Sequence, residues 1–240
     1  MGKVTVVGGK VGMEAPSTKI LASDISVGSI VKLMENGSPV EYLVVNQGIP
    51  SGSSLYDSSC AGTWLLRKDV FGKSEWALGR HNYGNSSLHT YVTETFFPVF
   101  DTNTQSIIKQ VKIPYRYSYD GSGIYTGSDG LPAKAFILSY HELNLDYNSA
   151  ALTDGACLTY FADASTSADS KRIAYLNGVA ANWWTRTSQY GNDGNSFFVT
   201  KAGYRSTANN TNTEPGVRPA LVLPFNALFD SKTLILKGVA

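Results

Sequence analysis

The chain has few cysteines, and it lacks any long apolar run. Two cysteines among 240 residues, Cys60 and Cys157, are too few for a disulfide framework and do not form a CxxC metal or redox motif. We expect two buried free thiols, with a single disulfide as the alternative. No segment approaches 18 consecutive apolar residues, so we expect no membrane insertion. The first residues also lack the apolar core of a signal peptide.

Charge is scarce as well. Only 16% of the residues are charged and the formal net charge is +1, which leaves no electrostatic basis for binding nucleic acid. Apolar residues make up 42%, as in ordinary globular proteins. The place of the missing charged residues is taken by Gly, Ser, Thr, Asn and Tyr. This mixture is typical of contact surfaces on extracellular and viral proteins, where Tyr supplies area and small polar residues supply hydrogen bonds.

Sequence signatures of catalysis are missing. The stretch Gly121–Gly127 has the wrong spacing for a dinucleotide fingerprint, and there is no Walker lysine, GxSxG or HExxH. The three histidines, His81, His89 and His141, show no metal-ligand spacing among themselves or with the cysteines. We therefore expect no enzyme activity, no metal and no cofactor.

The first half of the chain predicts strands followed by two helices. An Asn-Gly pair between Ile30–Met34 and Val40–Asn46 indicates a β-hairpin, and Gly62–Phe71 indicates a further strand. Helical spacing of apolar residues predicts a helix over Ser86–Phe97, capped by Ser86 or Ser87 and ended by Pro98. A second helix is expected over Thr102–Val111, with Asp101 as its cap.

The second half predicts short strands separated by long polar loops. Strands are expected at Asn182–Thr187, Ser196–Lys201 and Ala220–Leu223, with a turn at Ala202-Gly203 and a polar loop over 206–216. Long loops inside a compact domain are usually functional. We also expect the chain ends to meet, with a strand near residue 30 pairing with Ala220–Leu223 or Leu234–Leu236.

These elements predict an α+β fold with one domain, residues 23–240, and an N-terminal arm, residues 1–22. Val4–Val6 in the arm has strand character but no evident partner strand in the sequence. Because proteins usually cover an unpaired strand edge, we expect the arm to pair within a homo-oligomer, with a trimer favoured.

The C-terminal third resembles a known family. WWTRTS (Trp183–Ser188) and PGVRPALVLP (Pro215–Pro224) are similar to the end of a C-type-lectin-like domain of the formylglycine-generating-enzyme branch. GSIVKLMENGSPVEYLVVNQG, CAGTWLLRKDV and QSIIKQVKIPYR are similar to a domain family seen mostly in phage and bacterial proteins. The resemblance covers about residues 26–224, and it implies two short helices packed on small twisted antiparallel sheets with long C-terminal loops.

Members of this fold include variable receptor-binding proteins of diversity-generating retroelements, in which codons between the Trp-rich strand and the Gly-x-Arg-Pro strand are rewritten. Asparagine codons are the common targets, so Asn, Tyr, Ser and Asp accumulate there. The resemblance implies a diversified ligand-binding surface in this window. Its expected residues are Gln189, Tyr190, Asn192, Asp193, Asn195, Phe197, Tyr204, Arg205, Ser206, Asn209 and Asn210.

Two departures from the resemblance limit the alternatives. The oxidases of this branch use a pair of cysteines near the C-terminus, whereas this chain has no cysteine after Cys157. The Glu-Pro-Asn and Trp-Asn-Asp elements of calcium-dependent lectins are also missing. We expect Trp183 and Trp184 to be packed in the scaffold, and Arg186 and Arg218 to be structural rather than ligand-contacting.

The sequence therefore predicts a non-enzymatic receptor-binding protein, such as a phage tail-tip protein or a surface adhesin. Its expected partner is a host cell-surface protein or glycan, and its expected location is a virion or an extracellular surface. A formylglycine-generating-type oxidase and a virion decoration protein without a receptor are the alternatives.

Overall fold

The structure is a computed structural model. It describes residues 5–7, 10–12, 18–51, 53–77, 82–116, 123–145, 152–192, 194–211 and 213–240. The fold is α+β in the broad sense, with many short strands and few short helices.

The main sheet has five strands in the order β12-β19-β6-β5-β4. Its members are β4 (Ile30–Glu35), β5 (Ser38–Gln47), β6 (Thr63–Arg67), β12 (Ala135–Ile137) and β19 (Pro219–Leu223), and all of its ladders are antiparallel. The predicted hairpin is confirmed, because Asn36 and Gly37 adopt positive φ angles of 48° and 79° between β4 and β5. The strand predicted over Gly62–Phe71 is shorter, and it ends at Arg67.

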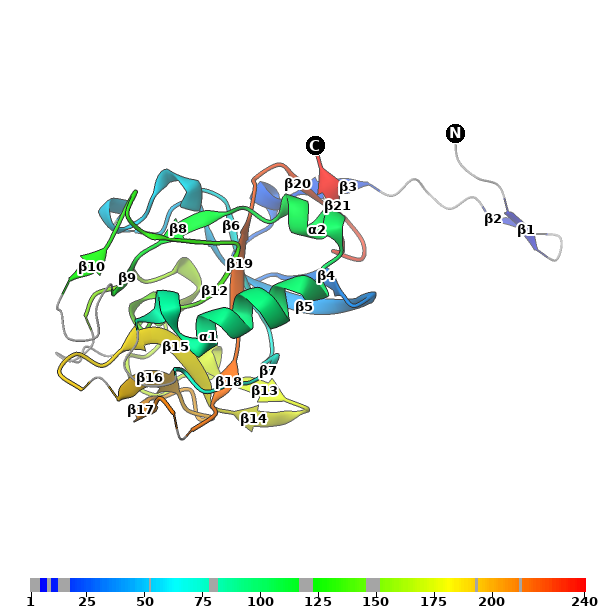
Figure 1. Ribbon diagram of the computed structural model, residues 1–240. Coiled ribbons are helices and arrows are strands. Elements are labelled where there is room, and N and C mark those ends of the chain that lie inside the picture. Colours follow the sequence, from blue (N-terminus) through cyan, green and yellow to red (C-terminus); the bar gives the residue numbers. More distant parts are fainter. Residues whose placement is uncertain are drawn as a thin grey trace.

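The second sheet also has five strands, in the order β17-β16-β15-β18-β7. They are β7 (Gly72–Lys73), β15 (Trp183–Ser188), β16 (Asn195–Val199), β17 (Arg205–Asn209) and β18 (Gly216–Val217). β15 pairs with β18 in parallel, and the other three ladders are antiparallel. In Figure 1 this sheet lies at the bottom of the view.

The hairpin of β16 and β17 confirms the turn at Ala202-Gly203, where Gly203 has a φ of 75°. The prediction of a polar loop over 206–216 was wrong for its first residues. Residues up to Asn209 belong to β17, because backbone pairing with β16 extends through Asn195↔Asn209.

The two predicted helices are present with different lengths. α1 (Ser87–Thr90) continues through a π-helical turn over Tyr91–Phe96 and a 3-10 turn over Phe97–Val99, and the three form one rod in Figure 1. The Ser86 side chain caps α1 by accepting from the backbone N–H of His89, at 3.0 Å.

The second helix, α2, spans Thr102–Ile107, and its cap Asp101 accepts from the backbone N–H of Thr104 at 2.7 Å. The prediction that it reaches Val111 was wrong. Ile108 is already extended, and β8 (Val111–Ile113) pairs with β11 (Leu131–Ala133), so a long-range ladder replaces the last helical turn.

The two ends of the domain meet in a third sheet, with the order β21-β20-β3. It consists of β3 (Lys19–Leu21), β20 (Ala227–Asp230) and β21 (Leu236–Val239), which lie at the top of the view in Figure 1. Lys32 of β4 also forms a bridge with Ile235, which confirms the expected contact between residue 30 and the last segment. Since β3 is part of this sheet, the domain begins before residue 23.

The arm contains its own strand pair. β1 (Thr5–Val7) and β2 (Lys10–Gly12) form an antiparallel hairpin with Val6 opposite Val11. The expectation that this strand has no partner in the chain was therefore wrong. A two-stranded sheet still leaves the outer edge of each strand unpaired, so the expected homo-oligomer stays a prediction.

Two small hairpins complete the described strands. β9 (Tyr115–Arg116) pairs with β10 (Ile124–Tyr125), and β13 (Ala174–Leu176) pairs with β14 (Val179–Ala181). Both cysteines are free thiols, as predicted, but only Cys60 is buried, and Cys157 is half-buried. Within the described ranges, no helix has the length and apolar character needed to cross a membrane.

Candidate binding surface

The scaffold of the candidate site is β15, whose six side chains are all buried. The indole N–H of Trp183 donates to the carbonyl of Arg172 at 2.9 Å, and that of Trp184 donates to the carbonyl of Ser74 at 2.8 Å. Each indole is therefore both packed and hydrogen-bonded, as buried tryptophans require. The prediction that these residues are scaffold is confirmed.

Arg186, also on β15, forms a buried ion pair. Its two terminal nitrogens each lie 2.7 Å from an oxygen of Glu142, and it also donates to the carbonyls of Pro114, Ile137 and Asp154. Burial disfavours the charged guanidinium, but attraction to and hydrogen bonds with Glu142 outweigh it and raise the pKa of Arg186. The predicted structural role of Arg186 is confirmed.

Arg218 packs behind the same strand. Its guanidinium lies 4.9 Å from the ring centre of Trp183, and its Nε donates to the carbonyl of Arg67 at 2.9 Å. Burial lowers the pKa of Arg218 to about 10. A buried cation stacked on an indole is a packing element, so the prediction for this residue is confirmed too.

The expected ligand-binding residues divide by exposure. Tyr190 and Tyr204 are 42% and 38% exposed, and Asn192 and Asn209 are also exposed. Asp193 lies outside the described residues. The remaining half-buried members are Gln189, Asn195, Arg205 and Ser206.

Two expected site residues are buried, and their assignment to the surface was wrong. Phe197 is 1% exposed, because it faces inward on β16 and its ring lies 4.8 Å from that of Tyr140. Asn210 is also 1% exposed. Its carbonyl accepts from the backbone N–H groups of Trp76 and Ala77, at 3.0 and 3.3 Å, so it fastens the end of β17 to another segment.

The strand register decides which of the remaining residues share a face. Side chains that lie opposite one another in neighbouring strands point to the same side of a sheet. Asn195 lies opposite Asn209, whereas Ser206 lies opposite Phe198 and shares the other face with it. Asn195, Asn209 and Arg205 therefore lie on the face of Phe197, at the two ends of the strand pair, where Asn209 is exposed and the other two are half-buried, whereas Ser206 lies on the opposite face.

Three expected residues form a row across the ends of the strands. The backbone N–H of Gln189 donates to the carbonyl of Asn195 at 3.0 Å, and Asn195 pairs with Asn209. The Asn209 side chain accepts from the backbone and side chain of Thr211, both at 2.9 Å. We call Gln189, Asn195 and Asn209 the contact row.

Tyr190 comes directly after Gln189 in the sequence, and its ring packs against Arg116. The sequence pattern did not single out Arg116. Arg116 is 4% exposed and lies with its guanidinium 5.5 Å from the ring centre of Tyr190. It donates to the Ser188 hydroxyl at 3.2 Å and to the Gln189 carbonyl at 3.1 Å. An exposed ring is thus held over a fixed cation.

Tyr204 and Arg205 form a second aromatic and cationic pair. The Arg205 guanidinium is 5.9 Å from the ring centre of Tyr204, and one of its nitrogens is 3.5 Å from the Tyr140 hydroxyl. Arg205 is the first residue of β17, and Tyr204 directly precedes it after the hairpin turn.

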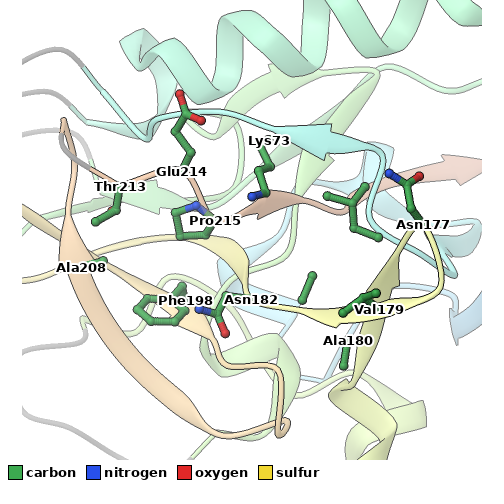
Figure 2. A pocket seen from close by; sticks show the side chains of 12 residues that line it. Lys73, Asn177, Val179, Ala180, Asn182, Phe198, Ala208, Thr213, Glu214 and Pro215 are labelled. Atoms are coloured by element: carbon green, nitrogen blue, oxygen red, sulfur yellow. The ribbon is translucent and has the colours of Figure 1, made fainter.

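A groove of about 590 Å³ lies beside the second sheet, and the sequence did not predict it. It is bounded by the β13–β14 hairpin, by β16 and β17, and by the segment that precedes β18 (Figure 2). Its lining residues are Lys73, Leu176, Asn177, Val179, Ala180, Ala181, Asn182, Phe198, Ala208, Thr213, Glu214 and Pro215.

Within the described ranges, no group of three or more His, Cys, Asp or Glu side chains is arranged to hold a metal ion. The chemistry of the surface is therefore that of exposed rings, amides and single charges. Such groups make hydrogen bonds and stacking contacts.

Comparison with known proteins gives one match. No curated protein and no solved structure matches the chain. Residues 61–225 match a family described as a domain of unknown function, DUF6273, and the matched segment includes β6, both helices and β15 to β19. Since this segment is well over half of the sequence, the chain belongs to the DUF6273 family.

Proposed function

We propose that the protein is a receptor-binding module with a C-type-lectin-like fold, and that it binds a host cell-surface protein or glycan. In this proposal it serves as a phage tail-tip protein or a surface adhesin, on a virion or at an extracellular surface. Its binding surface is the contact row together with Tyr190, Tyr204 and Arg205, and retroelement mutagenesis diversifies this surface.

The observation that carries the proposal is the placement of Tyr190 on Arg116. A tyrosine that is 42% exposed offers a large contact area, and the buried guanidinium beneath it limits its motion. Binding costs less free energy when contact residues are already ordered, and tyrosine and arginine are enriched at binding hot spots.

The rigidity of β15 supports the same function. Hydrogen bonds from Trp183, Trp184 and Arg186 fix this strand, while Tyr190 and Asn192, shortly after it, are exposed. Exposed residues next to a fixed strand can change without loss of the fold, which is what a diversified surface requires.

The direct test measures binding of the labelled protein to a panel of bacterial cells by flow cytometry. We expect Tyr190→Ala to weaken binding by roughly tenfold or more, as hot-spot truncations do, with an unchanged unfolding temperature. Tyr175→Ala is the matched control, because Tyr175 is similarly exposed (46%) but lies on the β13–β14 hairpin. Equal binding by the wild type and the Tyr190, Tyr204 and Arg205 alanine variants would contradict the proposed surface.

The proposal that a retroelement diversifies this surface can be tested separately in the DNA around the gene. A near-identical repeat of the codons for residues 183–219 should lie near the gene, together with a reverse transcriptase gene. If related isolates show no clustering of differences in this window, diversification by a retroelement is wrong, while a receptor-binding role can still hold.

A further inference from the structure

One side of the groove is a strand edge with a backbone N–H and a carbonyl that make no hydrogen bond to another described residue. In the β13–β14 hairpin, Tyr175 lies opposite Ala180. The backbone N–H of Tyr175 donates to a side-chain oxygen of Asp69 at 3.2 Å, and its carbonyl accepts from Val70 N–H at 3.0 Å. Both groups of Tyr175 therefore point away from β14.

Opposite residues in an antiparallel pair either exchange both hydrogen bonds with each other or direct both groups outward. Because Tyr175 directs its groups outward, the N–H and C=O of Ala180 point away from β13. Ala180 lines the groove, and neither backbone group makes a hydrogen bond to another described residue. The groove thus has a donor and an acceptor in the geometry of a strand edge.

The chain itself pairs with this edge two residues further on. β14 leads through Asn182 into β15, and the N–H of Gly216 donates to the carbonyl of Asn182 at 2.7 Å. There β18 runs parallel to β15, but the segment before Gly216 does not continue the pairing as far as Ala180. The edge is therefore hydrogen-bonded to Gly216 at Asn182, whereas at Ala180 it pairs with no described strand.

The other walls of the groove combine apolar and polar side chains, and one cation is directed into it. Phe198, Pro215 and Ala208 lie across it from Val179, which is 70% exposed. In Figure 2 the Lys73 side chain points toward Pro215, whereas the carboxylate of Glu214 points away from the groove. Among the described residues, Lys73 has no ion-pair partner.

We propose that this groove binds an extended peptide segment of a partner protein, which adds to β14 as a further strand. The peptide exchanges backbone hydrogen bonds with Ala180, places an apolar side chain over Phe198 and Pro215, and directs an acidic side chain to Lys73. Strand addition of this kind takes its affinity from the backbone and its specificity from alternate side chains. This site is separate from the contact row and does not depend on the function proposed above.

The test uses fluorescence anisotropy with a labelled, end-capped octapeptide of alternating valine and threonine that carries one central glutamate. We expect saturable binding to the full chain, and weaker binding of the same peptide with lysine in place of glutamate. Lys73→Met should weaken binding of the glutamate peptide roughly threefold, as for an exposed ion pair, and should abolish the preference between the two peptides. Lys237→Met removes an exposed lysine on β21. This control variant should change neither the affinity for the glutamate peptide nor the preference between the two peptides.

Ala180→Pro tests the backbone contact. Proline is tolerated at a strand edge where the N–H points outward, so the hairpin should persist while peptide binding falls roughly tenfold through the lost hydrogen bond. Ala180→Ser retains the N–H and should bind as the wild type does. In the wild type, the peptide should also slow hydrogen exchange at the Ala180 amide.

Three results would overturn the proposal. The first is the absence of saturable peptide binding to the folded wild-type chain. The second is unchanged peptide binding by both Ala180→Pro and Lys73→Met. The third is a dimer in light scattering that Ala180→Pro abolishes, because a second copy of the chain would then occupy the groove.

Discussion

Arg186 and Glu142 form a two-point ion pair in which both side chains are fully buried, with nitrogen–oxygen distances of 2.7 Å. Glu142 lies in a 3-10 turn, His141–Leu143, and Arg186 lies on β15, so the pair joins two segments that are 44 residues apart. The Tyr56 hydroxyl also donates to Glu142, at 2.8 Å. The strand beneath the proposed binding surface is fixed by charge as well as by packing.

Glu142→Gln should destabilise the protein strongly, because it leaves the Arg186 cation buried without its counter-charge. We expect the free energy of unfolding to fall by about 3–5 kcal/mol, as measured for buried pairs that lose one partner. Glu41→Gln is the control, since it removes an exposed pair with Lys68 and should cost at most about 1 kcal/mol. Urea unfolding of the two variants measures both values, and equal losses would contradict the structural role of the buried pair.

Side chains of the scaffold and of the binding surface should separate in their effect on stability. Trp183→Ala and Phe197→Ala remove buried aromatic side chains, and each should cost about 3–5 kcal/mol. Asn192→Ala and Asn209→Ala change exposed residues and should stay within about 0.5 kcal/mol. Thermal unfolding gives the comparison. Wild-type stability of the Phe197 variant would mean that this residue is exposed, as the sequence first indicated.

His89 should make the protein less stable in mild acid. Burial lowers its pKa below the ordinary value of 6.5, and its ring lies 5.0 Å from that of Tyr83. Below pH 6.5 the unfolded chain therefore binds a proton that the folded chain resists, so stability is present above this pH and is lost as the pH falls through the lower folded pKa.

Unfolding free energies at about pH 7.5 and about pH 5 should thus differ more in the wild type than in His89→Gln, because only the wild type has this titrating group. The same loss of stability in both proteins would assign the acid sensitivity to other residues.

The two thiols should react slowly in the folded protein and at different rates. Burial raises the pKa of Cys60 to about 11, and burial also raises the pKa of the half-buried Cys157. Because the thiolate is the reactive form, a disulfide reagent at neutral pH should label Cys157 first and Cys60 only on unfolding. The variants Cys60→Ala and Cys157→Ala show which thiol gives the fast and which the slow phase of labelling. Rapid labelling of Cys60 in the folded chain would contradict its burial.

Local sequence determined several elements of this protein without help from the rest of the chain. Asn36-Gly37 specified the first hairpin because these two residues accept positive φ angles at low cost. Ser86 and Asp101 marked the helix starts, since a side-chain oxygen three residues before a free N–H can cap it. The paired tryptophans also indicated a buried strand, because two large rings in succession are costly to expose.

The contacts between distant segments decided the rest. Alternation along β16 gives two faces, but only the position of Tyr140 makes the face of Phe197 the inner one. The second helix stops at Ile107 because β11 offers Val111 a strand partner, which no local preference records. Arg116 reaches Tyr190 from a different hairpin, and the groove combines residues from Lys73 to Pro215. Helix caps and turns depend on neighbours within a few residues, whereas a binding surface depends on which sheets and hairpins pack together, and that is fixed by the burial of the whole core.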